Sequence, residues 1–92
     1  LMVNQKQALD RGQKLHLHAT EEELGPNGEW TIVHDDDGLW WSHSHDKGDV
    51  ALRGPATDLL LALTRRRTAT DLGVDVLGDT SVWDRWLERT DF

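Results

Sequence analysis

The chain has 92 residues, with seventeen acidic side chains against ten lysines and arginines and a formal net charge of -7. This length suits one domain with a modest core, and the acidic balance argues against a nucleic-acid partner, which would need a basic stripe. The absence of cysteine excludes a disulfide framework, a thiol nucleophile and cysteine-bound zinc. No apolar run approaches membrane-spanning length and no signal segment opens the chain, so we expect a cytoplasmic domain with no membrane partner.

The N-terminal third predicts a tail, a strand and a loop. Residues 1–12 are polar and weakly patterned, and we expect a linker or N-terminal extension there, before a single domain over residues 13–92. In residues 13–20, leucine and histidine alternate with the period of two that marks a half-buried strand. Residues 21–28 combine a charge run with turn-forming residues, which predicts a loop.

A β-hairpin is predicted next, with strands over residues 29–35 and 39–44. Asp37-Gly38 between them is a strong two-residue turn signal, because a type I′ turn needs positive φ at both central positions. The aspartates before Gly38 also resemble part of a calcium loop. Aligning Gly38 with the invariant glycine of an EF-hand, however, places valine at the first ligand position and serine where the bidentate glutamate belongs. The hairpin therefore explains these residues better.

The central unit of the fold is predicted over residues 49–67. It comprises a strand over residues 49–53, a break at Gly54 and a helix from Pro55 to about Arg66. One apolar face recurs along this helix at i, i+3, i+4 and i+7, and we expect that whole face to pack on the sheet. Its members are Ala56, Leu59, Leu60 and Leu63. Three arginines close the helix, where positive charge suits its dipole.

The C-terminal third predicts a connection over residues 68–73, a strand over residues 74–77 and a closing helix. Asp79, Thr80 or Ser81 can cap that helix through a side-chain oxygen. Its apolar face is formed by Val82, Trp83, Trp86, Leu87 and Thr90. The predicted fold class is α+β, a single mainly antiparallel sheet of about five strands with two helices packed on one face.

The succession of these segments resembles a known family. LHLHAT, GEWTIV, the Asp-Gly hairpin, GDVALRGPATDLLLALTRR and the LGD turn before a tryptophan-rich helix are similar to the C-terminal domain of the mycothiol-dependent maleylpyruvate isomerase family. The likeness runs roughly from Lys14 to Phe92 and implies a sterol-carrier-like fold. In that family an N-terminal four-helix bundle holds a divalent metal (zinc) on His and Glu side chains and binds mycothiol. The C-terminal domain packs against the bundle and helps to shape the substrate site.

The resemblance implies that this chain is an accessory domain of a mycothiol- and metal-dependent maleylpyruvate isomerase or a related thiol transferase. Its partner would be the N-terminal metal-binding bundle of the same parent protein. Mycothiol and zinc would belong to that parent, and we expect this chain to bind no cofactor and to be inactive alone. An alternative is a freestanding sterol-carrier-like module that binds a small apolar ligand or a protein partner.

Four arginines are the candidate substrate-binding residues: Arg53, Arg65, Arg66 and Arg67. A guanidinium group binds a carboxylate bidentately, and maleylpyruvate, the substrate that the resemblance implies, is a dianion. The competing interpretation is a solvated helix end and a charge on a strand face. We expect no catalytic residue and no metal ligand in this chain.

The histidines permit a metal hypothesis. His16 and His18 share one side of a strand, as do His43 and His45 if their strand continues, and such pairs could offer imidazole ligands to Zn²⁺. No carboxylate stands at a telling position beside them in the sequence. We therefore prefer a solvated outer sheet face.

The positions of the tryptophans in the predicted strands indicate that some are buried in the core and one is exposed. We expect Trp30 in the core, together with either Trp40 or Trp41, because adjacent strand residues point to opposite faces. The other member of that pair then lies on the outer face. An exposed tryptophan there is a candidate for a partner surface, although simple edge packing is the preferred interpretation.

Overall fold

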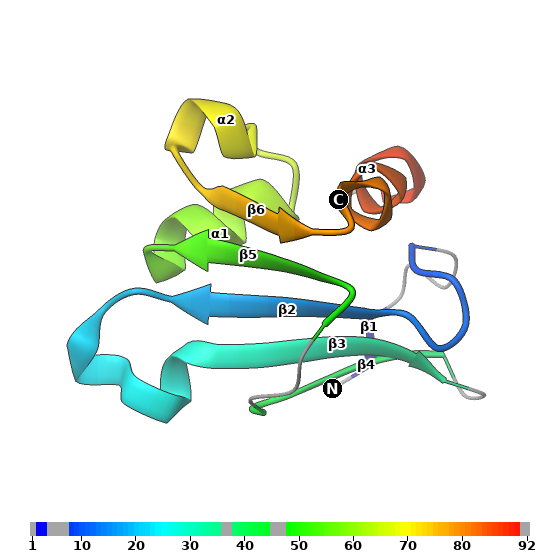
Figure 1. Ribbon diagram of the computed structural model, residues 1–92, viewed down its shortest axis with the longest axis horizontal. Coiled ribbons are helices and arrows are strands. Elements are labelled where there is room, and N and C mark those ends of the chain that lie inside the picture. The colour runs from blue at the N-terminus through cyan, green and yellow to red at the C-terminus, as the bar shows by residue number, and fades with distance from the viewer. Residues whose placement is uncertain (1, 4–7, 36–37, 45–47, 91–92) are drawn as a thin grey trace.

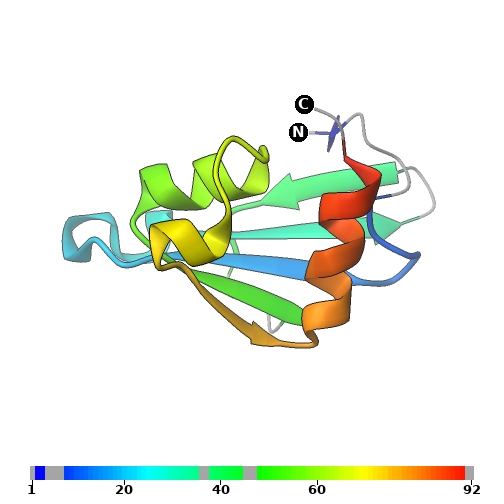
Figure 2. The same cartoon turned by 90° about the horizontal axis from the view of Figure 1, so that it is seen from above.

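The computed structural model describes residues 2–3, 8–35, 38–44 and 48–90. The strands of this part of the chain are β1 (Met2–Val3), β2 (Lys14–Ala19), β3 (Glu29–Asp35), β4 (Gly38–Ser42), β5 (Val50–Gly54) and β6 (Asp75–Gly78). Its helical elements are the 3₁₀ segment η1 (Glu22–Gly28) and the α-helices α1 (Ala56–Leu63), α2 (Ala69–Leu72) and α3 (Thr80–Arg89). The strands form one sheet in the order β1-β4-β3-β2-β5-β6, and the α-helices cover one of its faces (Figures 1 and 2).

The sheet is mainly antiparallel, with one parallel pair formed by β2 and β5. Because β4 and β5 are separated by two strands, the chain between them has to cross the sheet. Its two described ends contact the helix-free face. The hydroxyl of Ser44 donates to that of Thr31 at 2.9 Å, and Gly48 lies so close to His16 that an added Cβ would come within 3.1 Å of the His16 Cβ. Ser44 and Gly48 thus partly cover the helix-free face.

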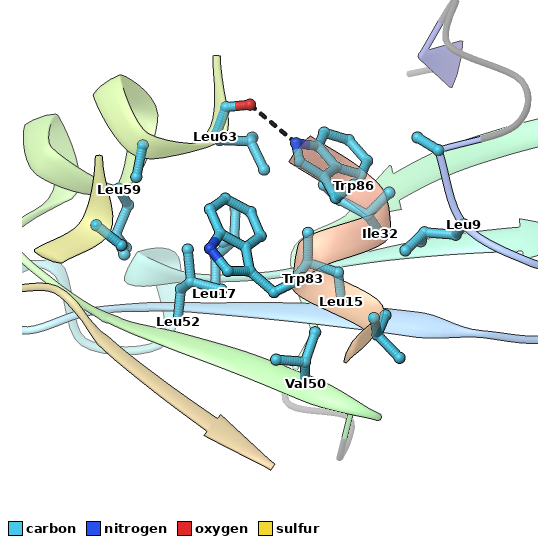
Figure 3. Packing of buried hydrophobic residues seen from close by; sticks show 14 of the residues in the cluster. Leu9, Leu15, Leu17, Ile32, Val50, Leu52, Leu59, Leu63, Trp83 and Trp86 are labelled. Carbon is cyan, nitrogen blue, oxygen red and sulfur yellow. Dashed lines mark hydrogen bonds between the residues drawn. The ribbon is translucent and has the colours of Figure 1, made fainter. Parts of the chain in front are cut away.

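The core lies between the sheet and the helices (Figure 3). Leu15, Leu17 and Leu52 point from the strands toward Trp83 and Trp86 of α3, and all are buried. Trp86 is fully buried, and its indole N–H donates to the carbonyl of Leu63 at 2.9 Å. That bond satisfies a buried donor and also joins α3 to the end of α1. The α+β class, the mainly antiparallel sheet and the placement of helices on one face are confirmed.

The apolar face of α1 was predicted incorrectly at one position. Leu59, Ala62 and Leu63 are buried, whereas Leu60 is 55% exposed. Leu60 stands about 100° from Leu59 around the helix axis, on the side away from Ala62. The sheet contact is therefore narrower than the four-residue face suggested, and Leu60 remains at the surface.

Helix α1 is also shorter than predicted, because it ends at Leu63 rather than near Arg66. Arg65 then adopts a left-handed φ of 61°, a conformation that usually favours glycine after a helix. The three arginines consequently form the turn after the helix and not its last turn. At the other end, the first backbone N–H donates to the Glu21 carboxylate at 3.0 Å, so a residue from a distant loop caps the helix.

Two expectations for the connections need correction. Residues 68–73 contain the short helix α2, in which Thr68 caps the N-terminus by accepting from the Asp71 N–H at 3.1 Å and Gly73 ends the helix at a φ of 72°. The hairpin between β3 and β4 forms, but Asp35 pairs with Gly38, so the connecting residues lie one position earlier than predicted. Gly38 does have positive φ, 126°, while Asp37 lies outside the described residues.

The N-terminal segment is more than a linker in the part that the structure describes. Ala8 and Leu9 are fully buried in the core, and β1 pairs with β4. Asp10 accepts hydrogen bonds from Arg85 and Arg89 of α3, the latter at 2.8 Å. Residues 8–10 therefore hold the last helix against the sheet.

Candidate functional site: an arginine-lined cavity and an apolar groove

A cavity of about 650 Å³ opens between the turn after α1 and helix α3. Its lining includes Arg65, Arg66 and Arg67 from the turn, called the arginine wall below, and Trp83 and Leu87 of α3, which contribute apolar surface. Further lining comes from Thr68, Ala69, Thr70, Asp71, Val76, Thr80 and Asp84. Three cations beside an indole ring suit an anion with an apolar or planar part, since guanidinium groups bind carboxylates and stack on aromatic faces.

The three arginines of this wall are not equivalent. Arg65 donates to the backbone carbonyl of Thr90 at 2.6 Å and so ties the turn to the end of α3. Arg66 donates to the carbonyl of Thr64 at 3.1 Å. The backbone N–H of Arg67 donates to the carbonyl of Leu61 at 3.3 Å. Its side chain is exposed and makes no hydrogen bond or ion pair with another described residue. Arg67 is thus the best placed of the three to bind a ligand without losing a structural contact.

Arg53 lies elsewhere. It is an exposed residue of β5 whose cross-strand neighbours are His18 and Asp75, all on the helix-free face. Of the four arginines singled out in the sequence, three therefore line one cavity and the fourth is separated from it by the sheet. A single anion cannot contact Arg53 and the arginine wall together.

An apolar groove of about 350 Å³ runs beside α1 on the helix-covered face. Its walls include Trp30 of β3, Trp41 of β4 and the exposed Leu60 of α1. Leu17, Ala56, Thr57, Leu59 and Leu63 complete it. A second hollow of about 240 Å³ continues from Trp30 and Trp41 to Ser42 and His43.

The tryptophans of the hairpin divide as expected. Trp30 and Trp41 are partly buried against the core, whereas Trp40 is on the other face and 36% exposed. The indole N–H of Trp30 donates to Nε2 of His43 at 3.2 Å. The indole N–H of Trp41 is buried and has no acceptor within the described residues, an uncommon state for a buried donor.

The helix-free face holds a group that the sequence did not reveal. His16, His18 and Glu29 lie together there, so the expectation of no carboxylate beside the histidines was wrong. His16 is only 7% exposed, so the expectation of a solvated face is wrong for this residue as well. Finding the group would have required the β2–β3 register, which pairs His18 with Glu29. His45, the fourth histidine considered, lies outside the described residues.

In the part of the chain that the structure describes, the α-helices cover one face of a single sheet, and this α+β fold is similar to sterol-carrier-like domains among solved structures. The chain aligns with the ubiquinone synthesis protein UbiJ-SCP2 at a TM-score of 0.67 and 16% identity, covering 91% of this chain and 72% of the other. A protein from Thermus thermophilus described as possibly a sterol carrier protein gives a TM-score of 0.53 at 14% identity, with 92% and 67% covered. The stereoselective inverting sec-alkylsulfatase Pisa1 from Pseudomonas gives 0.67 at 18% identity, but this chain spans only 14% of that protein.

A match between the sequence and a family model identifies the family of this chain. The family described as the MDMPI C-terminal domain matches residues 3–85, and the chain belongs to it. The match begins well before Lys14, in keeping with the buried N-terminal segment. No curated protein shows significant similarity to the chain. Among the described residues, no helix has the length and hydropathy needed to cross a bilayer.

Proposed function

We propose that this chain is the accessory C-terminal domain of a mycothiol- and metal-dependent maleylpyruvate isomerase or a related thiol transferase. It packs on an N-terminal helical bundle and contributes the arginine-lined cavity to an anionic substrate site, in the cytoplasm. Membership of the family over residues 3–85 is the observation that carries this proposal. The cavity walled by Arg65, Arg66 and Arg67 supports it, because a dianionic substrate needs cationic partners.

The catalytic metal and the thiol belong to the bundle in this proposal, because the residues that line the arginine-lined cavity do not fit them. The chain has no cysteine, and the arginine-lined cavity contains no histidine. The three arginines outnumber Asp71 and Asp84 in the lining of this cavity, and the resulting net positive charge disfavours a metal ion. In the parent, the metal and mycothiol held by the bundle would supply the thiolate nucleophile. This chain can bind, orient and cover the substrate.

The apolar groove is the surface that we assign to the bundle. Trp30, Trp41 and Leu60 present apolar area next to α1, and Leu60 is 55% exposed. Apolar residues gathered at a surface mark contact sites, and buried aromatic anchors contribute most to such interfaces. A helix of the bundle laid in the groove would cover Leu60.

Activity measurements test the accessory role. Maleylpyruvate isomerisation with mycothiol and zinc should be undetectable for the 92-residue chain and should appear when a bundle of the same family is fused to Leu1 or added in trans. Positioning a substrate without the nucleophile leaves most of the chemical barrier in place. Metal-dependent turnover by these residues alone would contradict the proposal, as would a bundle whose activity is unaffected by the domain.

Docking can be tested separately with one matched pair of variants. Leu60→Ser should weaken association with the bundle by roughly tenfold, the effect of losing about 1.4 kcal/mol of apolar burial. Leu77→Ser is the control, because Leu77 is 51% exposed on β6 but lies opposite Ala51 on the helix-free face. Equal effects of the two substitutions on the dissociation constant would rule out the groove as the docking surface.

The groove also supports the alternative of a freestanding module for a small apolar ligand. Its volume of about 350 Å³ is within the range of ligand sites, roughly 300–1,000 Å³. This alternative predicts that a fatty acid quenches the tryptophan fluorescence of the isolated chain. The quenching should be lost in Leu59→Trp, because the larger side chain fills the groove. The accessory-domain proposal predicts no such saturable quenching.

A further inference from the structure

We propose that His16, His18 and Glu29 form a zinc-binding site on the helix-free face of the sheet. His16 and His18 are two positions apart on β2, so their side chains project from the same face. Glu29 begins β3 and is the cross-strand partner of His18. The site therefore rests on two hydrogen-bonded strands and not on a loop.

The spacing of the donor atoms suits a tetrahedral metal ion. One carboxylate oxygen of Glu29, Oε1, lies 3.2 Å from Nε2 of His16 and 3.3 Å from Nδ1 of His18. The three ligand atoms all lie within 4.8 Å of one another. Zinc bonds of about 2.0–2.1 Å in a tetrahedron place neighbouring ligands about 3.3–3.4 Å apart. Two edges of the tetrahedron already have this length.

The surroundings of His16 fix its orientation. Its Nδ1 lies 3.4 Å from the hydroxyl of Thr31, which in turn accepts a hydrogen bond from Ser44 at 2.9 Å. Thr31 is 3% exposed, so this arrangement is shielded from water. Metal-ligating histidines characteristically have the second ring nitrogen held in this way, which directs the first toward the ion.

Burial at the site is graded. The side chains of His16 and Glu29 are 9% and 13% exposed, whereas that of His18 is 42% exposed. An ion would therefore enter past His18 and keep a position open to water. Two imidazoles and one carboxylate, with one open position, are a donor set that zinc accepts.

The competing arrangement is a carboxylate that accepts hydrogen bonds from two neutral imidazoles. That arrangement needs a proton on Nε2 of His16 and on Nδ1 of His18, because both nitrogens then donate to Glu29. Zinc needs the opposite tautomers, with lone pairs on those two nitrogens. The ¹⁵N shifts of the imidazoles distinguish the two states directly.

The test titrates the metal-free 92-residue chain with ZnCl₂ by calorimetry and follows the histidine ¹⁵N shifts. We expect one zinc ion per chain, with His16 bound through Nε2 and His18 through Nδ1. His18→Ala and Glu29→Gln should each reduce zinc affinity by about tenfold or more, since even outer partners of a metal contribute about 10–100-fold. His43→Ala is the control, because His43 follows β4 and contacts Trp30 instead, and it should change affinity by less than about twofold.

Three results would overturn the site: no calorimetric binding, zinc shifts confined to other histidines, or equal affinity in Glu29→Gln and wild type. The last two would indicate an adventitious ion only. Circular dichroism of each variant without metal checks the fold. If His18→Ala does not fold, Glu29→Gln and the wild-type ¹⁵N shifts still decide the question. Because the test measures zinc binding and not turnover, its outcome is independent of the proposed accessory function.

Discussion

The two faces of the sheet differ in how well their surroundings follow from the sequence. On the helix-covered face, Leu15, Leu17 and Leu52 are buried as their alternation predicts. On the other face, His16 and Thr31 are nearly as buried, although their pattern predicted contact with water. The ends of the β4–β5 connection contact both residues there. A period of two thus tells which residues share a face, but it does not tell what covers that face.

The largest expected effect concerns the centre of the helix-covered face. Trp86→Ala should lower the free energy of unfolding by about 3–5 kcal/mol, because it empties a fully buried site and removes the bond to the Leu63 carbonyl. Urea unfolding measures the change. Trp40→Ala, at a 36% exposed position on the helix-free face, should cost much less. Similar costs would mean that the two faces are equally packed.

The second prediction compares adjacent leucines of α1. Leu59→Ala should destabilise by about 2–5 kcal/mol, whereas Leu60→Ala should cost under about 0.5 kcal/mol in the isolated chain. The reason is burial, since Leu59 is 2% exposed and Leu60 55%. The denaturant midpoints of both variants at one temperature measure this difference in stability. A larger loss of unfolding free energy for Leu60→Ala would mean that Leu60 is packed, as the sequence spacing predicted.

The third prediction concerns the hairpin at the end of the sheet. Gly38 has a φ of 126°, which a β-branched side chain does not tolerate. Gly38→Val should therefore lower the free energy of unfolding by about 1 kcal/mol or more. Val33→Thr, a change on the neighbouring strand without a φ requirement, is the control. An unchanged melting curve for Gly38→Val would contradict the turn geometry.

The smallest effect depends on pH. A hydrogen bond from Arg89, with the charge of Arg85, holds the pKa of the Asp10 carboxyl below its usual 3.8. A lowered folded-state pKa stabilises the fold above pH 3.8, and this contribution is lost as the pH falls through the folded value. Asp10→Asn should therefore be slightly less stable at neutral pH, with the difference vanishing in strong acid. Urea midpoints across this range measure it, and a difference that persists in strong acid would exclude the ionised carboxyl as its cause.

Much of the fold was predictable because local rules and burial agree. The strand of residues 29–35 has the predicted bounds, and Asp79 caps α3 as its side chain suggested, accepting from the Ser81 N–H at 3.1 Å. The helix-covered core follows from apolar periodicity. Features that depend on contacts between residues far apart in the chain could not be predicted from the sequence. Glu21 capping α1 from 35 residues away has no local sequence signal, and neither has the burial of Leu9 in a polar segment.

The candidate site was predictable only in part, for the same reason. Arg65, Arg66 and Arg67 are adjacent in sequence, so any turn brings them near one another. Their separation from Arg53 depends on the face of the sheet from which Arg53 of β5 projects. The contact of Glu29 with His16 depends on the register between β2 and β3. The remaining lining comes in part from α3, whose position is set by tertiary packing.

The proposed function places the substrate on the helix-covered face. The most direct test is kcat/KM for maleylpyruvate in an assembly of this chain with a helical bundle of the same family, compared between Arg67→Gln and Arg53→Gln. We expect Arg67→Gln to lower kcat/KM by about tenfold or more, because a hydrogen bond to a charged group contributes about 1.5–3 kcal/mol. Arg53→Gln, on the opposite face, should leave it within about twofold of wild type. A loss with Arg53→Gln and none with Arg67→Gln would place the substrate on the helix-free face and contradict this account.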